Sequence, residues 1–311
     1  MKGWLTRLNA GKVVVWGLKF PNHTHYFIHR GFYDAMRKLG VPVTWVSDSP
    51  QSQRILDVGD VIIAVNVASS WLPRSSRFRY CLHNCDDCIA GIEPSRYIRL
   101  QVMTEAIFTA MATRSVQRAS PTLEGVSGFD STTQTLYQSC GTPTLQQDFR
   151  PPVCNAYKNT EFFVGSIWNN DLNQGNESAV TEYRRHLRQI GLKFVHAKGI
   201  PEKWSPLFVR QSVFGAAIVG DWQRVNGYTP CRLFKAVSWG QQGSINSASS
   251  GRQYPWAVHG ATIEEAVNRI LSLRPADRLE LIKMQQSYVA SETYEQKVGN
   301  ILACLCFVSE S

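Results

Sequence analysis

The feature that most constrains the fold is an uninterrupted apolar run, KVVVWGL, at residues 12–18. A strand with one solvated face alternates apolar and polar side chains, so a continuous run indicates a strand covered on both faces, as in a parallel sheet. Helical spacing of apolar residues follows at residues 25–39 and stops at Gly40, and residues 41–46 form a second apolar run. This order predicts a strand, a helix and a parallel strand.

The same alternation continues along the first half of the chain. Short apolar runs predict three more strands and a doubly wound α/β domain, at residues 61–66, 78–83 and 98–103. Residues 120–157 are rich in Ser, Thr, Gln, Gly and Pro, and this change of composition predicts a domain boundary. A chain of 311 residues exceeds what one hydrophobic core usually organises, so we expect two domains, at residues 1–150 and 151–311.

The second half repeats the pattern. We expect a helix at residues 177–191 and helical regions at 263–271 and 277–306, with strands at residues 161–167, 192–196, 214–220 and 243–246. Open parallel sheets bind ligands beyond the carboxyl ends of their strands. Two Rossmann-like, doubly wound domains would therefore face a cleft that is lined by the loops after the strands.

Composition places the chain among soluble globular proteins, with 43% hydrophobic and 18% charged residues. Its formal net charge of +9 favours acidic partners, which include phosphates, anionic glycans, lipid headgroups and nucleic acid. No apolar stretch reaches the roughly 18 to 20 residues that span a bilayer, and the N-terminus lacks a signal-peptide core. We therefore expect a cytoplasmic protein without a transmembrane segment, and the charge permits peripheral contact with a membrane.

Eight cysteines without a secretion signal indicate reduced thiols. The group Cys81, His83, Cys85 and Cys88 suggests zinc, but the spacing lacks a second pair of ligands to close a tetrahedron, so we expect no metal site. The sequence also lacks the glycine fingerprint of nicotinamide and flavin enzymes, a P-loop and an Asp-x-Asp pair. These absences argue against dinucleotide enzymes and P-loop hydrolases, and predict chemistry without a resident cofactor or metal.

The most informative motif is YTPCRLFKAVSWG at residues 228–240, which runs on into a glycine-flanked short strand. Pro230 predicts the start of a helix that carries Arg232 and Lys235. The first-turn amides of a helix are unpaired and its amino end is positive, so this segment, with the forked guanidinium of Arg232, suits a diphosphate. An ordinary amphipathic helix with one surface arginine is the alternative interpretation.

Together with Ala217-Ile-Val-Gly220-Asp221, this motif resembles the donor-binding segment of GT-B glycosyltransferases. The resemblance implies transfer from a nucleotide diphosphate sugar without a metal, and a last helix that packs back on the first domain. Many retaining members carry a glutamate where this chain has Lys235, so the stereochemical course stays open. The implied donor-binding residues are Gly165, Ser166, Asp221, Tyr228, Arg232, Lys235 and Asn246.

Inverting transfer needs a base for the acceptor hydroxyl, and histidine suits this role because its pKa lies near neutrality. In many inverting GT-B enzymes, such a histidine lies between the first strand and the first helix, where this chain has His23 and His25. We take both as catalytic candidates, with capping of the helix start as the alternative role. His29 lies one turn further, and we expect it at the surface.

A second group of polar residues follows the fourth predicted strand. His83 with Asp86 and Asp87 forms the alternative base group, in which we take Asp87 as a catalytic candidate, and a solvated turn is the other interpretation. We place His83 and Asp48 on the acceptor side, because both lie at the carboxyl ends of predicted strands.

The resemblance implies a hexosyl- or pentosyltransferase of glycan biosynthesis, which moves sugar from a nucleotide diphosphate sugar to a glycan or another hydroxyl acceptor. A nucleic-acid-binding protein is the main non-enzymatic alternative, since the chain is basic and has nine tryptophans. The basic residues are dispersed, however, and no helix-turn-helix, RNP or zinc-finger pattern occurs in the sequence. A sugar-nucleotide epimerase on the same two-domain scaffold is the second alternative.

Overall fold

The computed structural model describes residues 2–21, 24–84, 90–114, 121–139, 141, 146–155 and 158–310. The chain divides into two compact units, of which the first comprises residues 1–103, 110–140 and 293–311 and the second comprises residues 104–109 and 141–292. Residues 141–150 thus group with the second unit, and residues 293–311 group with the first. In the described part of the chain, no helix combines the length and apolarity that a membrane crossing requires.

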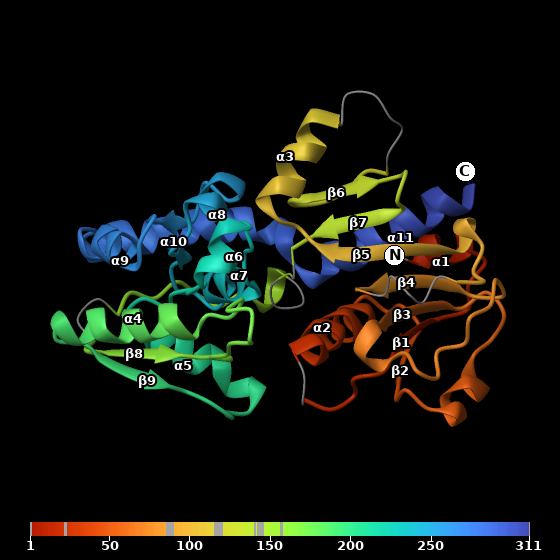
Figure 1. The fold of residues 1–311 in the computed structure, drawn as a ribbon, viewed down its shortest axis with the longest axis horizontal. Coiled ribbons are helices and arrows are strands. Elements are labelled where there is room, and N and C mark those ends of the chain that lie inside the picture. The colour runs from red at the N-terminus through yellow and green to blue at the C-terminus, as the bar shows by residue number, and fades with distance from the viewer. Residues whose placement is uncertain are drawn as a thin grey trace. The chain divides into compact units, whose positions relative to one another are not determined.

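The first unit is built on a seven-stranded sheet in the order β2-β1-β3-β4-β5-β7-β6 (Figure 1). Neighbouring strands are parallel except β6 and β7, which form an antiparallel hairpin at one edge. The five predicted strands are confirmed, whereas the hairpin lies in the segment expected to be a linker. The strands are β1 (Val13–Trp16), β2 (Val43–Val46), β3 (Val61–Val65), β4 (Arg79–His83), β5 (Tyr97–Val102), β6 (Ser127–Asp130) and β7 (Thr135–Gln138).

Both faces of this sheet are covered, as the continuous apolar runs predicted. Successive side chains of a strand point to opposite faces. Ile63 and Cys81 therefore join a cluster with helices α2 (Thr24–Lys38) and α11 (Tyr294–Glu310), whereas Ile62 and Tyr80 join a second cluster. The smaller elements of this unit are α1 (Lys2–Arg7), α3 (Glu105–Arg114, of which residues 105–109 group with the second unit), η1 (Pro50–Ile55), η2 (Asn66–Ala68) and η4 (Pro94–Arg96).

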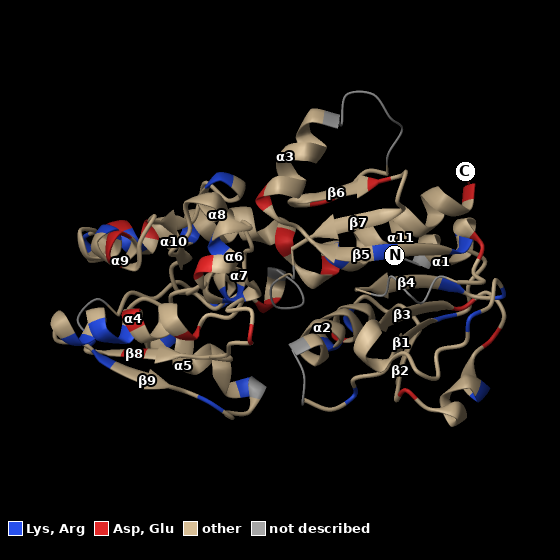
Figure 2. Cartoon of the chain, in the orientation of Figure 1, with Lys and Arg blue, Asp and Glu red and all other residues tan. Residues whose placement is uncertain are grey.

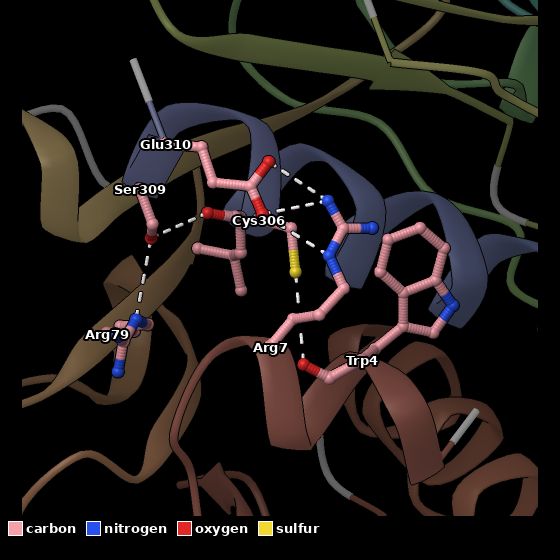
Figure 3. Close-up of polar contacts among 7 residues, drawn as sticks. Trp4, Arg7, Arg79, Cys306, Ser309 and Glu310 are labelled. Atoms are coloured by element: carbon pink, nitrogen blue, oxygen red, sulfur yellow. Dashed lines mark hydrogen bonds and ion pairs between the residues drawn. The ribbon is translucent and has the colours of Figure 1, made fainter.

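Helix α11 packs within the first unit at both of its ends. Gly31 of α2 lies against Tyr294, and a Cβ atom at position 31 would stand 2.4 Å from the tyrosine ring. At the other end, Arg7 of α1 donates hydrogen bonds of 2.8 and 2.9 Å to the two carboxylate oxygens of Glu310 (Figure 3). The helical region expected at residues 277–306 is therefore two α-helices, separated by the short η7 (Ala290–Glu292).

The second unit contains two parallel strand pairs, β8 (Thr160–Phe163) with β9 (Lys193–His196) and β10 (Ser244–Ile245) with β11 (Val258–His259). Residues 213–219 lie between the pairs, because the Val213 N–H donates to Thr160 O at 3.2 Å and the Ala217 N–H donates to Ser244 O at 2.9 Å. The order β9, β8, 213–219, β10, β11 repeats the order β2, β1, β3, β4, β5 of the first unit. The predicted α/β class, with two Rossmann-like units, is thus confirmed.

The strand expected at residues 214–220 is not a regular strand, since only Ala217 forms a ladder bridge, with Ile245. The carboxylate of Glu161 accepts the backbone N–H groups of residues 214–216 at 2.8 to 3.3 Å, in place of strand carbonyls. Glu161 is buried, and this burial raises its pKa. Gly215 has a φ of +61°, a left-handed conformation that interrupts extended backbone.

Helices surround these strands in the second unit. They are α4 (Glu177–Gln189), α5 (Ser205–Gln211), α6 (Asp221–Val225), α7 (Cys231–Ser238), α8 (Ala248–Gln253), α9 (Ile263–Leu271) and α10 (Pro275–Val289), with the short η5 (Gln146–Asp148) and η6 (Glu202–Trp204). The helices predicted at 177–191, at 263–271 and from Pro230 onward are confirmed as α4, α9 and α7.

Candidate functional site

The side chain of Arg232 packs against the carboxyl end of β8. We call the group of Phe163, Val164, Gly165, His196 and Arg232 the Arg232 locus. The guanidinium carbon lies 4.1 Å from the ring centroid of Phe163, and Nε donates to the Val164 carbonyl oxygen at 2.9 Å. Gly165 has a φ of +131°, and a Cβ atom there would lie 2.2 Å from Nη2 of Arg232. Only glycine leaves room for the guanidinium at this position.

The positive charge of Arg232 has no counter-ion in the part of the chain that the structure describes. The side chain is half-buried, and burial lowers its pKa, but a guanidinium stays charged under all conditions in which proteins fold. Among the described residues only Nε–H has a hydrogen-bond acceptor, so both Nη groups remain for a ligand. Two other predicted donor residues, Tyr228 and Lys235, are half-buried before and within α7. The locus therefore suits an anion.

His196 is a member of this locus that we did not select from the sequence. It is the last residue of β9, and its Nε2 lies 2.8 Å from the carbonyl oxygen of Gly165. Its position directly at the end of a predicted strand was the signal that would have identified it. Ser166, a predicted donor residue, is exposed beside Gly165, and its carbonyl oxygen accepts a hydrogen bond of 3.3 Å from Asn176.

The remaining donor candidates lie at the carboxyl edge of the same sheet. Asp221 is exposed at the first position of α6 and pairs with Arg224 at 2.7 Å. Asn246 is buried, and its amide binds both backbone groups of Val219, with its oxygen accepting at 2.8 Å and its nitrogen donating at 2.9 Å. This amide therefore joins the end of β10 to residues 213–219 and has a structural task.

In the first unit, one residue from each of the two alternative base groups, His25 and His83, lies in a single cluster. His25 in the first turn of α2 and His83 at the end of β4 have ring centroids 4.6 Å apart, at an interplanar angle of 84°. His29 stacks on His83 at 5.8 Å. The expectation of a surface position for His29 was wrong, because it is fully buried. It shares the inward face of α2 with Phe32, three residues later, a helical spacing that the sequence already contained.

Burial keeps two of these imidazoles neutral. It lowers the pKa of His29 to about 3, and it lowers the pKa of His83 well below 6.5 with help from the neighbouring histidines. Among the described residues, the two ring nitrogens of His29 have no hydrogen-bond partner, and Nδ1 of His83 has none either. His25 is half-exposed, and its Nε2 lies 3.2 Å from the side-chain nitrogen of Asn84. The cluster is therefore two neutral buried rings behind one accessible ring.

Asp48, another first-unit candidate, forms its hydrogen bonds with residues outside this cluster. The carboxylate of Asp48 accepts hydrogen bonds from Nε1 of Trp16 at 2.8 Å and from the backbone N–H groups of Ser70 and Trp71 at 3.0 and 2.9 Å. It therefore ties together the chain after β2 and the chain after β3. The candidates His23 and Asp87 lie outside the described residues.

The cysteine and histidine group considered for zinc lies only partly within the described residues. Within the described ranges, no group of three or more His, Cys, Asp and Glu residues is arranged to hold a metal ion. Cys81 is buried in β4, where burial raises the pKa of its thiol, and a neutral thiol is a poor metal ligand. Cys85 and Cys88, the other thiols of this group, lie outside the described residues.

Comparison with solved structures identifies the fold. A structure described as trehalose-6-phosphate synthase, OtsA, matches with a TM-score of 0.52 and 10% sequence identity, covering 96% of this chain and 98% of that chain. One described as "Trehalose-6-phosphate from E. coli bound with UDP-2-fluoro glucose" matches with a TM-score of 0.49, 10% identity and coverage of 96% and 98%. An OtsA apo structure matches with a TM-score of 0.43, 11% identity and coverage of 91% and 76%.

These matches rest on structure rather than on sequence. No protein-family model matches the chain, and no curated protein matches it in sequence. At 10% identity the match to the synthase with a TM-score of 0.52 establishes the fold. Each unit also has the strand order of a Rossmann-like sheet. The chain thus has the GT-B glycosyltransferase fold that the block around Arg232 predicted.

Proposed function

We propose that this chain is a glycosyltransferase that transfers a hexosyl unit from a nucleotide diphosphate sugar without a metal ion, with the diphosphate bound at the Arg232 locus. The supporting observation is the guanidinium of Arg232, which has no counter-ion among the described residues and lies at the carboxyl end of β8. Rossmann-like sheets bind ligands at this edge. The fold match to a trehalose-6-phosphate synthase is consistent with sugar transfer.

The proposed chemistry uses the positive charge of Arg232 and the basic ring nitrogen of His25. The acceptor oxygen attacks the anomeric carbon, the bond from that carbon to the diphosphate oxygen breaks, and its electrons leave with the diphosphate. The Nη groups of Arg232, with the ammonium of Lys235 one turn along α7, offset the charge that develops there. In an inverting course the hydroxyl proton moves to the half-exposed His25. The acceptor would be a glycan or another hydroxyl compound.

The charge distribution favours a small anionic ligand over a nucleic acid. Figure 2 shows Lys and Arg spread over the helices and strands of the described chain and mixed with Asp and Glu. Nucleic-acid binding needs several cationic side chains along one phosphate backbone. A single desolvated guanidinium beside a glycine instead fits one diphosphate group.

Isothermal titration of the full chain with UDP, GDP, ADP and CMP tests the donor site. We expect a nucleoside diphosphate to bind and Arg232→Ala to weaken it by about 1.5 to 3 kcal/mol, or roughly 10- to 150-fold, the range for hydrogen bonds to a charged group. Arg232→Lys keeps the charge but not the fork, so its affinity should lie between the two. Arg274→Ala, which removes an exposed arginine paired with Asp277, is the control and should bind like the wild type. Unchanged affinity in Arg232→Ala would refute the site.

A further inference from the structure

The side chain of Asn84 lies within hydrogen-bond distance of the ring of His25. Asn84 directly follows β4, and its Nδ2 lies 3.2 Å from Nε2 of His25 on α2. An amide nitrogen donates hydrogen bonds and does not accept them. This hydrogen bond forms only when Nε2 presents its lone pair, so it favours the neutral ring with its proton on Nδ1.

The backbone holds Asn84 in place for this contact. Its φ is +52°, a left-handed conformation that asparagine adopts more readily than most residues. Its backbone N–H donates to the carbonyl oxygen of Leu100 on the neighbouring β5 at 3.2 Å. The amide thus projects from a residue that is fixed to the edge of the sheet, and little reorganisation is needed to keep the hydrogen bond to His25.

The rings around His25 reinforce this arrangement. The ring of His83 is nearly perpendicular to that of His25, with 4.6 Å between the ring centroids. The ring of His29 stacks on the ring of His83 at a centroid distance of 5.8 Å. His29 and His83 are buried and neutral, so neither adds a positive charge beside His25 at neutral pH. On the same helix, the charges of Arg30 and Asp34 pair with each other at 2.7 Å.

We infer that Asn84 is a positioning residue that keeps His25 in the tautomer with a bare Nε2. This inference rests on the proposed function, in which the acceptor hydroxyl donates to Nε2 in place of the Asn84 amide. The O–H bond breaks as the acceptor oxygen bonds to the anomeric carbon, a new N–H bond forms on Nε2, and the ring becomes an imidazolium. A ring with its proton already on Nε2 cannot accept this proton there.

Nitrogen NMR of the full chain with ¹⁵N-labelled histidine reads the tautomer directly, because protonated and bare ring nitrogens have well-separated shifts. In the wild type, His25 should show a protonated Nδ1 and a bare Nε2, and a His25→Gln variant assigns its signals. Asn84→Asp should reverse the pattern, because a carboxylate only accepts and would take a hydrogen bond from Nε2–H. Asn84→Gly tolerates the left-handed backbone but lacks the amide, so the share of His25 with its proton on Nδ1 should fall.

Turnover supplies the second readout. We expect Asn84→Asp to lower kcat by roughly 100-fold, the lower end of the range for general base catalysis, with unchanged affinity for the nucleoside diphosphate. An unreversed tautomer in Asn84→Asp would overturn the inference, as would Asn84→Gly that matches the wild type in both readouts. Absence of glycosyl transfer by the wild type would instead refute the proposed function, and the NMR pattern would still decide the tautomer.

Discussion

Acidification should destabilise the first unit through its two buried histidines. The pKa of His29 is about 3 in the folded chain, against 6.5 for the free side chain. Because the folded pKa is the lower one, the unfolded chain binds the proton first, and stability is lost as the pH falls from about 6.5 towards about 3. Between about pH 7.5 and about pH 5.5, this linkage costs about 1.4 kcal/mol for His29. Burial also lowers the pKa of His83, so its linkage acts in the same direction.

His29→Leu isolates the first of these contributions. Leucine has a similar volume and does not titrate, so the variant should lose about 1.4 kcal/mol less than the wild type over the same two pH units. Phe32→Leu is the control, since it changes the same buried face of α2 without removing a titrating group, and it should keep the pH dependence of the wild type.

Denaturant-dependent hydrogen exchange, followed by mass spectrometry on peptides that cover β3 and β4, measures the free energy of unfolding of the first unit alone. The measured exchange rates are divided by the intrinsic rates at each pH, because amide exchange is itself pH-dependent. If His29→Leu and the wild type lost equal stability between about pH 7.5 and about pH 5.5, the assignment of His29 as a buried neutral imidazole would be wrong.

Two stability predictions concern other buried contacts. Gly31→Ala should lower the free energy of unfolding by about 1 to 3 kcal/mol in urea denaturation, because the new Cβ would overlap the ring of Tyr294, whereas Gly3→Ala, with nothing within 4 Å of its Cβ, should cost nothing. Glu161→Gln leaves one oxygen to accept the N–H groups of residues 214–216, so it should cost about 1 to 3 kcal/mol at neutral pH. The exposed Glu280→Gln is its control, and equal stability of these two variants would show that the Glu161 contacts contribute little.

Local sequence patterns predicted most of the regular elements. A strand covered on both faces must be apolar at every position, and a half-buried helix must repeat its apolar residues every three or four positions. The run at residues 12–18 is β1 and the spacing at residues 25–39 is α2, each within a few residues. The β6–β7 hairpin escaped prediction because its strands are four residues long and rich in polar side chains.

The segment at residues 213–219 shows where the pattern misleads. Its apolar sequence is that of a buried strand, and it does occupy a strand position between β8 and β10. Its amides are nevertheless bound by the carboxylate of Glu161, about fifty residues earlier in the chain. The pattern of apolar residues indicates which residues are buried. It does not indicate whether a backbone carbonyl or a side chain accepts the hydrogen bonds of their N–H groups.

Local residue patterns were enough to predict the α/β class, a helix start just before Arg232, and the place of His83 at the end of a strand. The contacts among His25, His29 and His83, and the guanidinium of Arg232 against Gly165, became visible only in the folded chain. Hydrophobic periodicity acts over a few residues and specifies which face of an element is buried. The pairing of distant elements depends on strand order and on the packing of α2 and α7 against particular strands, which is a property of the whole chain.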